Sequence, residues 1–148
     1  MCPTFWGQYK DFVDLLCNTP KIIQENIEWR EQNGSQRFKA RVLAPEIGDQ
    51  LELRGVIGKS KRSFSLLYER VPIRRYCYSW TAHTNSNGDR ITEPHKHTWS
   101  TDHDDRNAYV PTDIDPTEGV NEQLFSFMKE VNIFLEAFYQ NLLVEDQS

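Results

Sequence analysis

The sequence predicts an α+β fold with an N-terminal helical hairpin, a four- to five-stranded antiparallel meander sheet covered on one face, and a long C-terminal helix. Apolar residues recur at helical spacing near both ends of the chain, and they alternate with polar residues through its middle third. At 148 residues, with 38% apolar and 26% charged residues, the chain has the size and composition of one globular domain. We therefore expect a single domain over residues 1–148.

Both ends of the chain are predicted to be helical. A first helix is predicted over residues 5–17 and a second over residues 20–32, because Thr19 is a favourable N-cap and proline suits the first position of a helix. The Asn33-Gly34 pair is expected to end the second helix. A third helix is predicted over residues 121–143. Its apolar face is formed by Leu124, Met128, Val131, Leu135, Phe138 and Leu142.

The middle of the chain alternates with a period of two and predicts strands. A fifth, short strand over about residues 95–100 is expected to return along the fourth. Each strand has one apolar and one polar face, which predicts an antiparallel sheet with helices on one side only. The four main strands centre on Phe38–Val42, Leu51–Ile57, Phe64–Tyr68 and Tyr76–Trp80.

The polar face of the predicted sheet is basic. A face of this kind suits the phosphate backbone of a nucleic acid. Equally, long basic side chains can simply solvate the free side of a sheet and cover it with their stems. The basic residues of this face are Arg37, Lys39, Arg41, Arg54 and Arg75.

A histidine-rich motif follows the fourth strand. His95 and His97 are two residues apart, so in a strand both side chains leave the same face. Asn87-Gly88 suits a two-residue hairpin turn, which would bring His83 back toward the other two histidines. The motif therefore predicts three imidazoles in one small volume.

Such a cluster can act in three ways. Two imidazoles can serve as base and acid on an RNA phosphodiester, with Arg75 as phosphate clamp, Lys96 as a further contact and Tyr109 stacking on a base. Three histidines can also bind a divalent metal, together with Asp102, His103 and Asp104. They can also be structural, hydrogen-bonded to the loop backbone. We expect no stoichiometric metal and no other cofactor, because cysteines are absent from the cluster and the aspartates follow in a separate loop.

The motif has the form H-x-N-x-x-G-x-x-I-x-x-P-H-x-H over residues 83–97, followed by Ala108-Tyr109-x-Pro111. It resembles a group of small uncharacterised prokaryotic and phage-associated proteins, and it is distantly similar to TumE-type, RelE-like toxins of toxin–antitoxin systems. The resemblance covers about residues 62–140. It implies that His83, His95 and His97 are the functional residues and that Tyr109 is their neighbour.

These observations together predict a toxin-like ribonuclease of a toxin–antitoxin or phage/plasmid conflict system that cleaves RNA without a metal. The partners expected are an RNA substrate and an antitoxin or defence protein. The alternatives are a non-catalytic anti-defence or partner-binding protein, whose acidic loop at residues 102–115 imitates nucleic acid, and a metal-dependent hydrolase. Three scattered cysteines, no secretory signal and no apolar run of about 20 residues predict a cytoplasmic protein.

Overall fold

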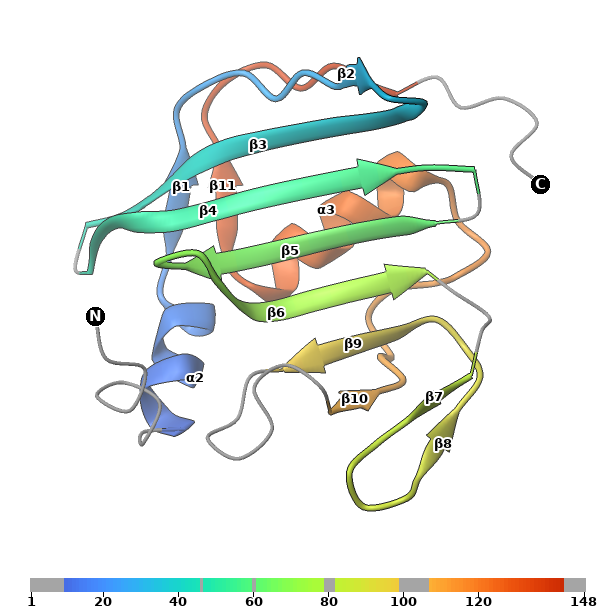
Figure 1. The fold of residues 1–148 in the computed structure, drawn as a ribbon. Coiled ribbons are helices and arrows are strands. Elements are labelled where there is room, and N and C mark those ends of the chain that lie inside the picture. Colours follow the sequence, from blue (N-terminus) through green and yellow to red (C-terminus); the bar gives the residue numbers. More distant parts are fainter. Residues whose placement is uncertain (1–9, 46, 60, 79–81, 99–106, 143–148) are drawn as a thin grey trace.

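A computed structural model of the chain describes residues 10–45, 47–59, 61–78, 82–98 and 107–142. Within these residues, nine strands form one mixed sheet, and two short helices lie behind it (Figure 1). The helices are α2 (Lys10–Asn18) and α3 (Val120–Glu130). The predicted α+β fold, with its helical hairpin and long C-terminal helix, is therefore wrong, because the described part of the chain is mostly β.

The centre of the sheet is an antiparallel meander of four strands, in the segments where the sequence alternates. The edge beyond β6 is extended by β9 (His95–Thr98) and β10 (Ala108–Tyr109). A separate two-stranded hairpin, β7 (His83–Thr84) and β8 (Arg90–Ile91), lies beside that edge (Figure 1). The meander strands are β3 (Ser35–Ala44), β4 (Gly48–Ile57), β5 (Arg62–Tyr68) and β6 (Val71–Tyr78).

The predicted second helix is absent, and its residues are mostly extended. They contain β1 (Lys21–Ile23), which pairs with β3, and β2 (Arg30–Gln32), which also pairs with β3. Asn33 and Gly34 both have positive φ angles, 52° and 83°, so the pair forms the tight turn between β2 and β3 instead of ending a helix. The β-branched isoleucines of this segment favour extended backbone, and pairing with β3 stabilises it.

The predicted C-terminal helix ends at Glu130, after fewer turns than its apolar spacing indicated. Asn132 follows with a φ angle of 60°, a left-handed conformation that ends helices and that asparagine tolerates. Its side-chain amide donates a hydrogen bond of 2.7 Å to the carbonyl oxygen of Asn18, at the end of α2. The chain then continues as β11 (Ile133–Leu135), which pairs in parallel with β1.

The apolar core lies between the sheet and the helices. Of the residues predicted to face the core, Phe38, Leu53 and Leu66 are buried, Tyr78 is half-buried against the same core, and Trp80 lies outside the described residues. Phe127 of α3 packs against Phe64, with ring centroids 6.1 Å apart. The opposite face of the sheet carries no helix in Figure 1, and we call it the open face.

Leu53→Ala should lower the free energy of unfolding by about 2–5 kcal/mol, because a fully buried leucine leaves a cavity when it is truncated. Urea unfolding would measure the loss. Val56→Ala is the matched control, since Val56 lies on β4 with its side chain on the open face and is only half-buried. A loss below about 0.5 kcal/mol for Leu53→Ala would mean that the two faces are assigned the wrong way round.

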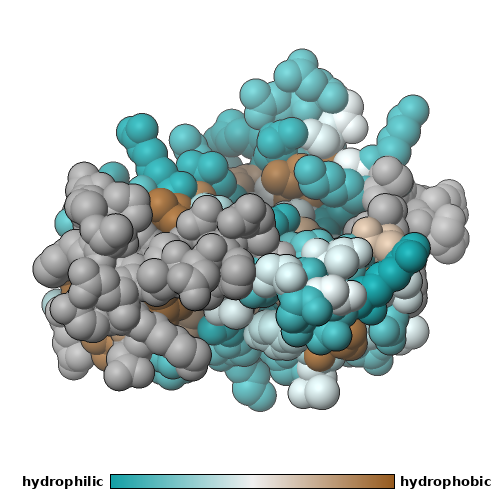
Figure 2. All heavy atoms as spheres, turned by 60° about the horizontal axis from the view of Figure 1, so that its bottom comes forward, coloured by the Kyte–Doolittle hydropathy of each residue, from teal (hydrophilic) through white to brown (hydrophobic). Residues whose placement is uncertain are grey.

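Of the residues that Figure 2 colours by hydropathy, most are hydrophilic, and the apolar ones lie in small separate areas. Neither helix in the described residues is long and apolar enough to cross a membrane.

Candidate functional site

The three motif histidines come together at one edge of the open face. β6 and β9 pair so that His95 lies opposite Cys77 and His97 lies opposite Arg75. Because directly paired residues point to the same side of a sheet, all four side chains leave the open face. His83 joins them from the β7–β8 hairpin. We call Cys77, His83, His95 and His97 the His/Cys cluster.

The imidazoles are in mutual contact. Ring centroids are 4.8 Å apart for His95 and His97, 4.9 Å for His83 and His97, and 5.2 Å for His83 and His95. The prediction that the motif gathers them in one volume is confirmed by these distances. The connection between β7 and β8 is longer than the expected two-residue turn, since it spans residues 85–89. His95 and His97 are each only 4% exposed, so they are buried side chains.

Asn85 fixes the orientation of His83. Its amide is held at both ends by Ala108, whose N–H donates to Asn85 Oδ1 at 2.8 Å and whose carbonyl oxygen accepts from Asn85 Nδ2 at 2.9 Å. The atom facing His83 Nε2 at 3.0 Å is therefore an oxygen, which only accepts. His83 Nε2 must therefore carry a proton and donate it to Asn85 Oδ1.

His95 is fixed in a comparable way. Its Nδ1 lies 2.8 Å from the carbonyl oxygen of Glu93, so Nδ1 donates and Nε2 keeps a lone pair. Burial lowers the pKa of His95 below its usual range, and the nearby guanidinium of Arg75 acts in the same direction. The ring is therefore neutral at pH 7, with Nε2 available to accept a proton or bind a metal.

Cys77 belongs to the same cluster. Cys77, His95 and His97 each offer one atom that could bind a metal, and these three atoms lie within 4.8 Å of one another. Our expectation that no cysteine lies near the histidines is therefore wrong. Arg75 Nη1 donates to Cys77 Sγ at 3.0 Å, and the guanidinium stabilises negative charge on that sulfur. Asp102, His103 and Asp104 lie outside the described residues, as do Trp80 and Thr81.

The spacing of the imidazoles bears on the chemistry that they can perform. In-line cleavage of a phosphodiester by two imidazoles requires one on either side of the phosphoryl group. A hydrogen bond of about 2.8 Å is needed on each side in addition to the width of the group itself. Rings with centroids 4.8–5.2 Å apart leave no room for that arrangement. The cluster suits a single centre that acts from one side of the substrate.

A row of polar side chains runs across the open face from the cluster. Consecutive strands pair residue by residue along this line, from His97 on β9 to Lys39 on β3. Four strand spacings of about 4.8 Å give the line a length of roughly 19 Å. We call it the basic row, and its members are His97, Arg75, Ser65, Arg54 and Lys39.

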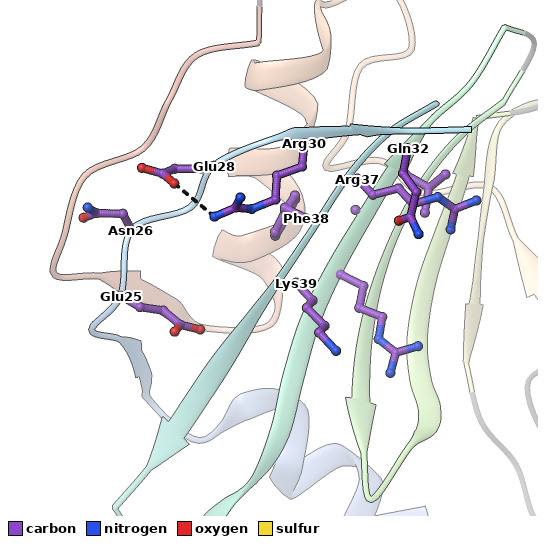
Figure 3. Close-up of a pocket in the computed structure, with 11 residues that line it drawn as sticks. Glu25, Asn26, Glu28, Arg30, Gln32, Arg37, Phe38 and Lys39 are labelled. Carbon is purple, nitrogen blue, oxygen red and sulfur yellow. Dashed lines mark ion pairs between the residues drawn. The ribbon is translucent and has the colours of Figure 1, made fainter. Parts of the chain in front are cut away.

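The far end of the basic row opens into a groove between β2, β3 and β4. In Figure 3, Lys39 and Arg37 lie on the same side of the sheet, and Arg30 is turned toward Glu28. Arg30 and Glu28 form an exposed ion pair at 3.6 Å. Among the described residues, Arg37 and Lys39 have no ion-pair partner. The groove therefore keeps exposed positive charge next to the open face.

Arg54 and Arg41 are also exposed on the open face. Arg54 forms an ion pair with Glu52 at 2.9 Å, and Glu52 lies directly opposite Arg41 on β3. Lys39, by contrast, lies directly opposite Arg54. Like charges directly opposite each other destabilise a sheet. The site therefore places two cations together where an anion can bind both.

Lys96 does not belong to the open face, and its prediction as a nucleic-acid contact is wrong. It alternates with His95 and His97 along β9, so its side chain points toward α3 and is fully buried. Its ammonium donates to Asp113 Oδ2 and to Glu130 Oε1, both at 2.7 Å. This ion pair also means that Asp113 of the acidic loop is already neutralised.

Tyr109 lies on the same side of the sheet as Lys96, because the two residues pair between β10 and β9. Its hydroxyl is 3.5 Å from Arg74 Nη1, and Arg74 is also bonded to Glu130. Tyr109 therefore lies across the sheet from the histidines, and it cannot stack on a base bound at the cluster.

Residues 9–133 match a protein family that is described as a family of unknown function (DUF6978). No curated protein and no solved structure shows significant similarity to the chain.

Proposed function

Because the chain belongs to this family of unknown function, DUF6978, we propose its activity from the site itself: cleavage of single-stranded RNA at the His/Cys cluster. The observation that carries the proposal is the continuity of the basic row with the cluster on one open face. The similarity of the motif to TumE-type toxins supports a role in a toxin–antitoxin or phage/plasmid conflict system.

The basic row provides a binding track for phosphates. Arg75, Arg54 and Lys39 supply three cations along one line, and Ser65 between them supplies a hydroxyl donor. Phosphate contacts of these kinds position a nucleic acid without reading its sequence. The track is one side chain wide, which suits a single strand.

The binding track ends at the His/Cys cluster. Arg75 is the last cation of the row, and its partner across β9 is His97. A guanidinium in that position stabilises negative charge that develops on a phosphoryl oxygen during cleavage. The cluster then takes the proton of the attacking oxygen from one side. That oxygen bonds to phosphorus while the bond from phosphorus to the 5′-oxygen of the next nucleotide breaks, and the 5′-oxygen leaves with a proton from water. In RNA the 2′-hydroxyl is available as that nucleophile, whereas DNA lacks it.

The first test is incubation of the full chain with end-labelled single-stranded RNA, with single-stranded DNA and duplex RNA of the same sequence as comparisons. We expect cleavage of single-stranded RNA only. RNA that stays intact at stoichiometric enzyme contradicts the proposal, and a protein that binds RNA tightly without cutting it would be a binding protein instead.

Binding through the track has its own readout. With 2′-O-methyl RNA, which lacks the nucleophile, the logarithm of the affinity should fall linearly with the logarithm of the salt concentration. Lys39→Ala and Arg54→Ala should each reduce that slope by about 0.7, the value for one lost single-strand phosphate contact. Lys129→Ala is the matched control, since this exposed lysine lies on α3 behind the sheet. Equal slopes for all three variants would exclude the track.

A further inference from the structure

We propose that Cys77, His95 and His97 bind one transition-metal ion of the zinc class. The three residues lie on two paired strands, with Cys77 directly opposite His95 and with His97 two positions further along the same face. Their ligand atoms are within 4.8 Å of one another. The site itself does not depend on RNA cleavage, and only its catalytic use rests on the proposed function.

The donor set fits this class of ion. Thiolate and imidazole bind zinc at about 2.3 Å and 2.0–2.1 Å, so two ligands of one ion are roughly 3.5 Å apart. Small side-chain rotations bring atoms within 4.8 Å of one another to that separation. Magnesium and calcium require oxygen ligands, which these three side chains lack. Sulfur together with two nitrogens therefore selects a softer ion.

The surroundings of the ligands have the features of a metal site. Metal-binding histidines usually donate their other ring nitrogen to a backbone carbonyl or carboxylate, which fixes the ring and its tautomer. His95 does so through Nδ1 and the carbonyl oxygen of Glu93, at 2.8 Å, which leaves Nε2 to bind. Arg75 donates to Cys77 Sγ at 3.0 Å and stabilises the thiolate that binds metal.

Burial distinguishes this cluster from ordinary polar residues of the open face. His95 and His97 are each 4% exposed, whereas Arg75 and Ser65, which follow His97 in the basic row, are half-buried, and Arg54 and Lys39 at its far end are exposed. Burying a polar ring is unfavourable unless its nitrogens have partners. A metal ion bound at Nε2 of His95, the nitrogen that keeps a lone pair, would offset part of that cost.

Three protein ligands leave one tetrahedral position for water or substrate, which is the arrangement of catalytic rather than structural zinc sites. His83 borders these three ligands, with its ring centroid 4.9 Å from that of His97. A bound ion would lower the pKa of a coordinated water and polarise a phosphoryl oxygen from one side. Such an ion would act on the substrate from one side, as the close spacing of the imidazoles requires.

The test is a metal titration of the full chain after treatment with a chelator. Zn²⁺ added in competition with a chromophoric chelator should bind with a stoichiometry of about one. Co²⁺ in place of Zn²⁺ should give visible bands of tetrahedral intensity and a near-ultraviolet band from thiolate to Co²⁺. The cobalt spectrum is measured on the wild-type chain. It therefore tests whether a cysteine binds the metal even if a variant fails to fold.

Cys77→Ala should remove the thiolate band and weaken zinc binding by at least about 100-fold. Loss of a residue that only hydrogen-bonds to a ligand weakens metal binding by up to about 100-fold, so the loss of a ligand should have at least that effect. Cys17→Ala is the matched control, because this buried cysteine lies in α2 on the other side of the sheet and should keep both properties. A wild-type chain without the cobalt bands, or zinc binding unchanged by Cys77→Ala, overturns the metal site.

The metal titration and the cleavage assay test the two proposals independently. Zinc bound at one equivalent with RNA left intact supports the metal site and contradicts the proposed function. RNA cleaved equally well by the zinc-free and the zinc-loaded chain overturns the catalytic use of the metal.

Discussion

Glu130→Ala should lower the free energy of unfolding by about 3–5 kcal/mol, the cost of breaking a buried ion pair by removing one partner. Glu130 Oε1 accepts a hydrogen bond from Lys96, and Oε2 accepts one from Arg74. Lys96 is fully buried and Arg74 is 9% exposed, so both cations have little access to water that could replace the lost carboxylate. Asp113 would remain for Lys96, whereas Arg74 would keep only Tyr109.

Urea unfolding at pH 7 measures this loss. Glu136→Ala is a matched control, since Glu136 is exposed and lies just beyond β11. It should change the free energy of unfolding by no more than about 0.5 kcal/mol. A Glu130→Ala loss as small as that of the control would show that the two cations find other partners, and that the charge cluster behind β9 does not stabilise the fold.

His83→Ala should lower the rate of RNA cleavage by at least about 10²-fold, the lower limit for a positioned group that transfers a proton or orients the attacking oxygen. His83 is half-buried and lies on the short β7–β8 hairpin, outside the main sheet. Its removal should therefore leave the melting temperature nearly unchanged. Single-turnover cleavage of labelled RNA, with the melting temperature measured on the same preparations, tests both expectations.

The zinc content of His83→Ala adds a second criterion. With three ligands from the main sheet, the variant should keep its metal. If it loses the metal, four protein ligands close the coordination sphere, and the site is structural. Asn85→Ala, which removes the acceptor of the His83 Nε2 proton, should reduce cleavage less than His83→Ala. Equal cleavage by the wild-type chain and His83→Ala would exclude His83 from the reaction.

The meander could be predicted from the sequence because each strand has one buried face. Phe38, Leu53, Phe64 and Tyr76 alternate with polar residues, and the packing of the sheet on one side alone preserves that pattern. The same alternation predicted that His95 and His97 share a face. The same alternation places Lys96 on the other face, which packs against the helices. The burial of Lys96 therefore follows from the sequence pattern as well.

The ends of the chain could not be predicted, because short strands and short helices share local patterns. Leu124, Met128 and Val131 do lie on one buried helical face, but Leu135 and Phe138 continue the spacing by coincidence. Phe138 is 64% exposed. The strands β1 and β11 are each three residues long and are stabilised by pairing with each other, a long-range contact that no local window contains.

Cys77 was missed as a member of the candidate site because it lies outside the histidine motif. Its position could have been inferred from two facts in the sequence. Cys77 has the same parity as Arg75 on the fourth strand, and the fifth strand was expected to return along that strand. The sequence does not give the register between these two strands. In the structure, the register of β6 with β9 places Cys77 directly opposite His95.

The pairing of β1 with β11 has a consequence for how the chain folds. Backbone contacts in this region join residues far apart in sequence, such as the hydrogen bond of 2.8 Å that Glu136 N–H donates to the carbonyl oxygen of Ile23. During synthesis, β1 leaves the ribosome long before its parallel neighbour exists, so its outer edge stays unpaired while the meander forms. Loop closure over such a distance is slow, and an unpaired edge can associate with other chains. The vulnerable interval is therefore the time between the synthesis of β1 and the synthesis of β11.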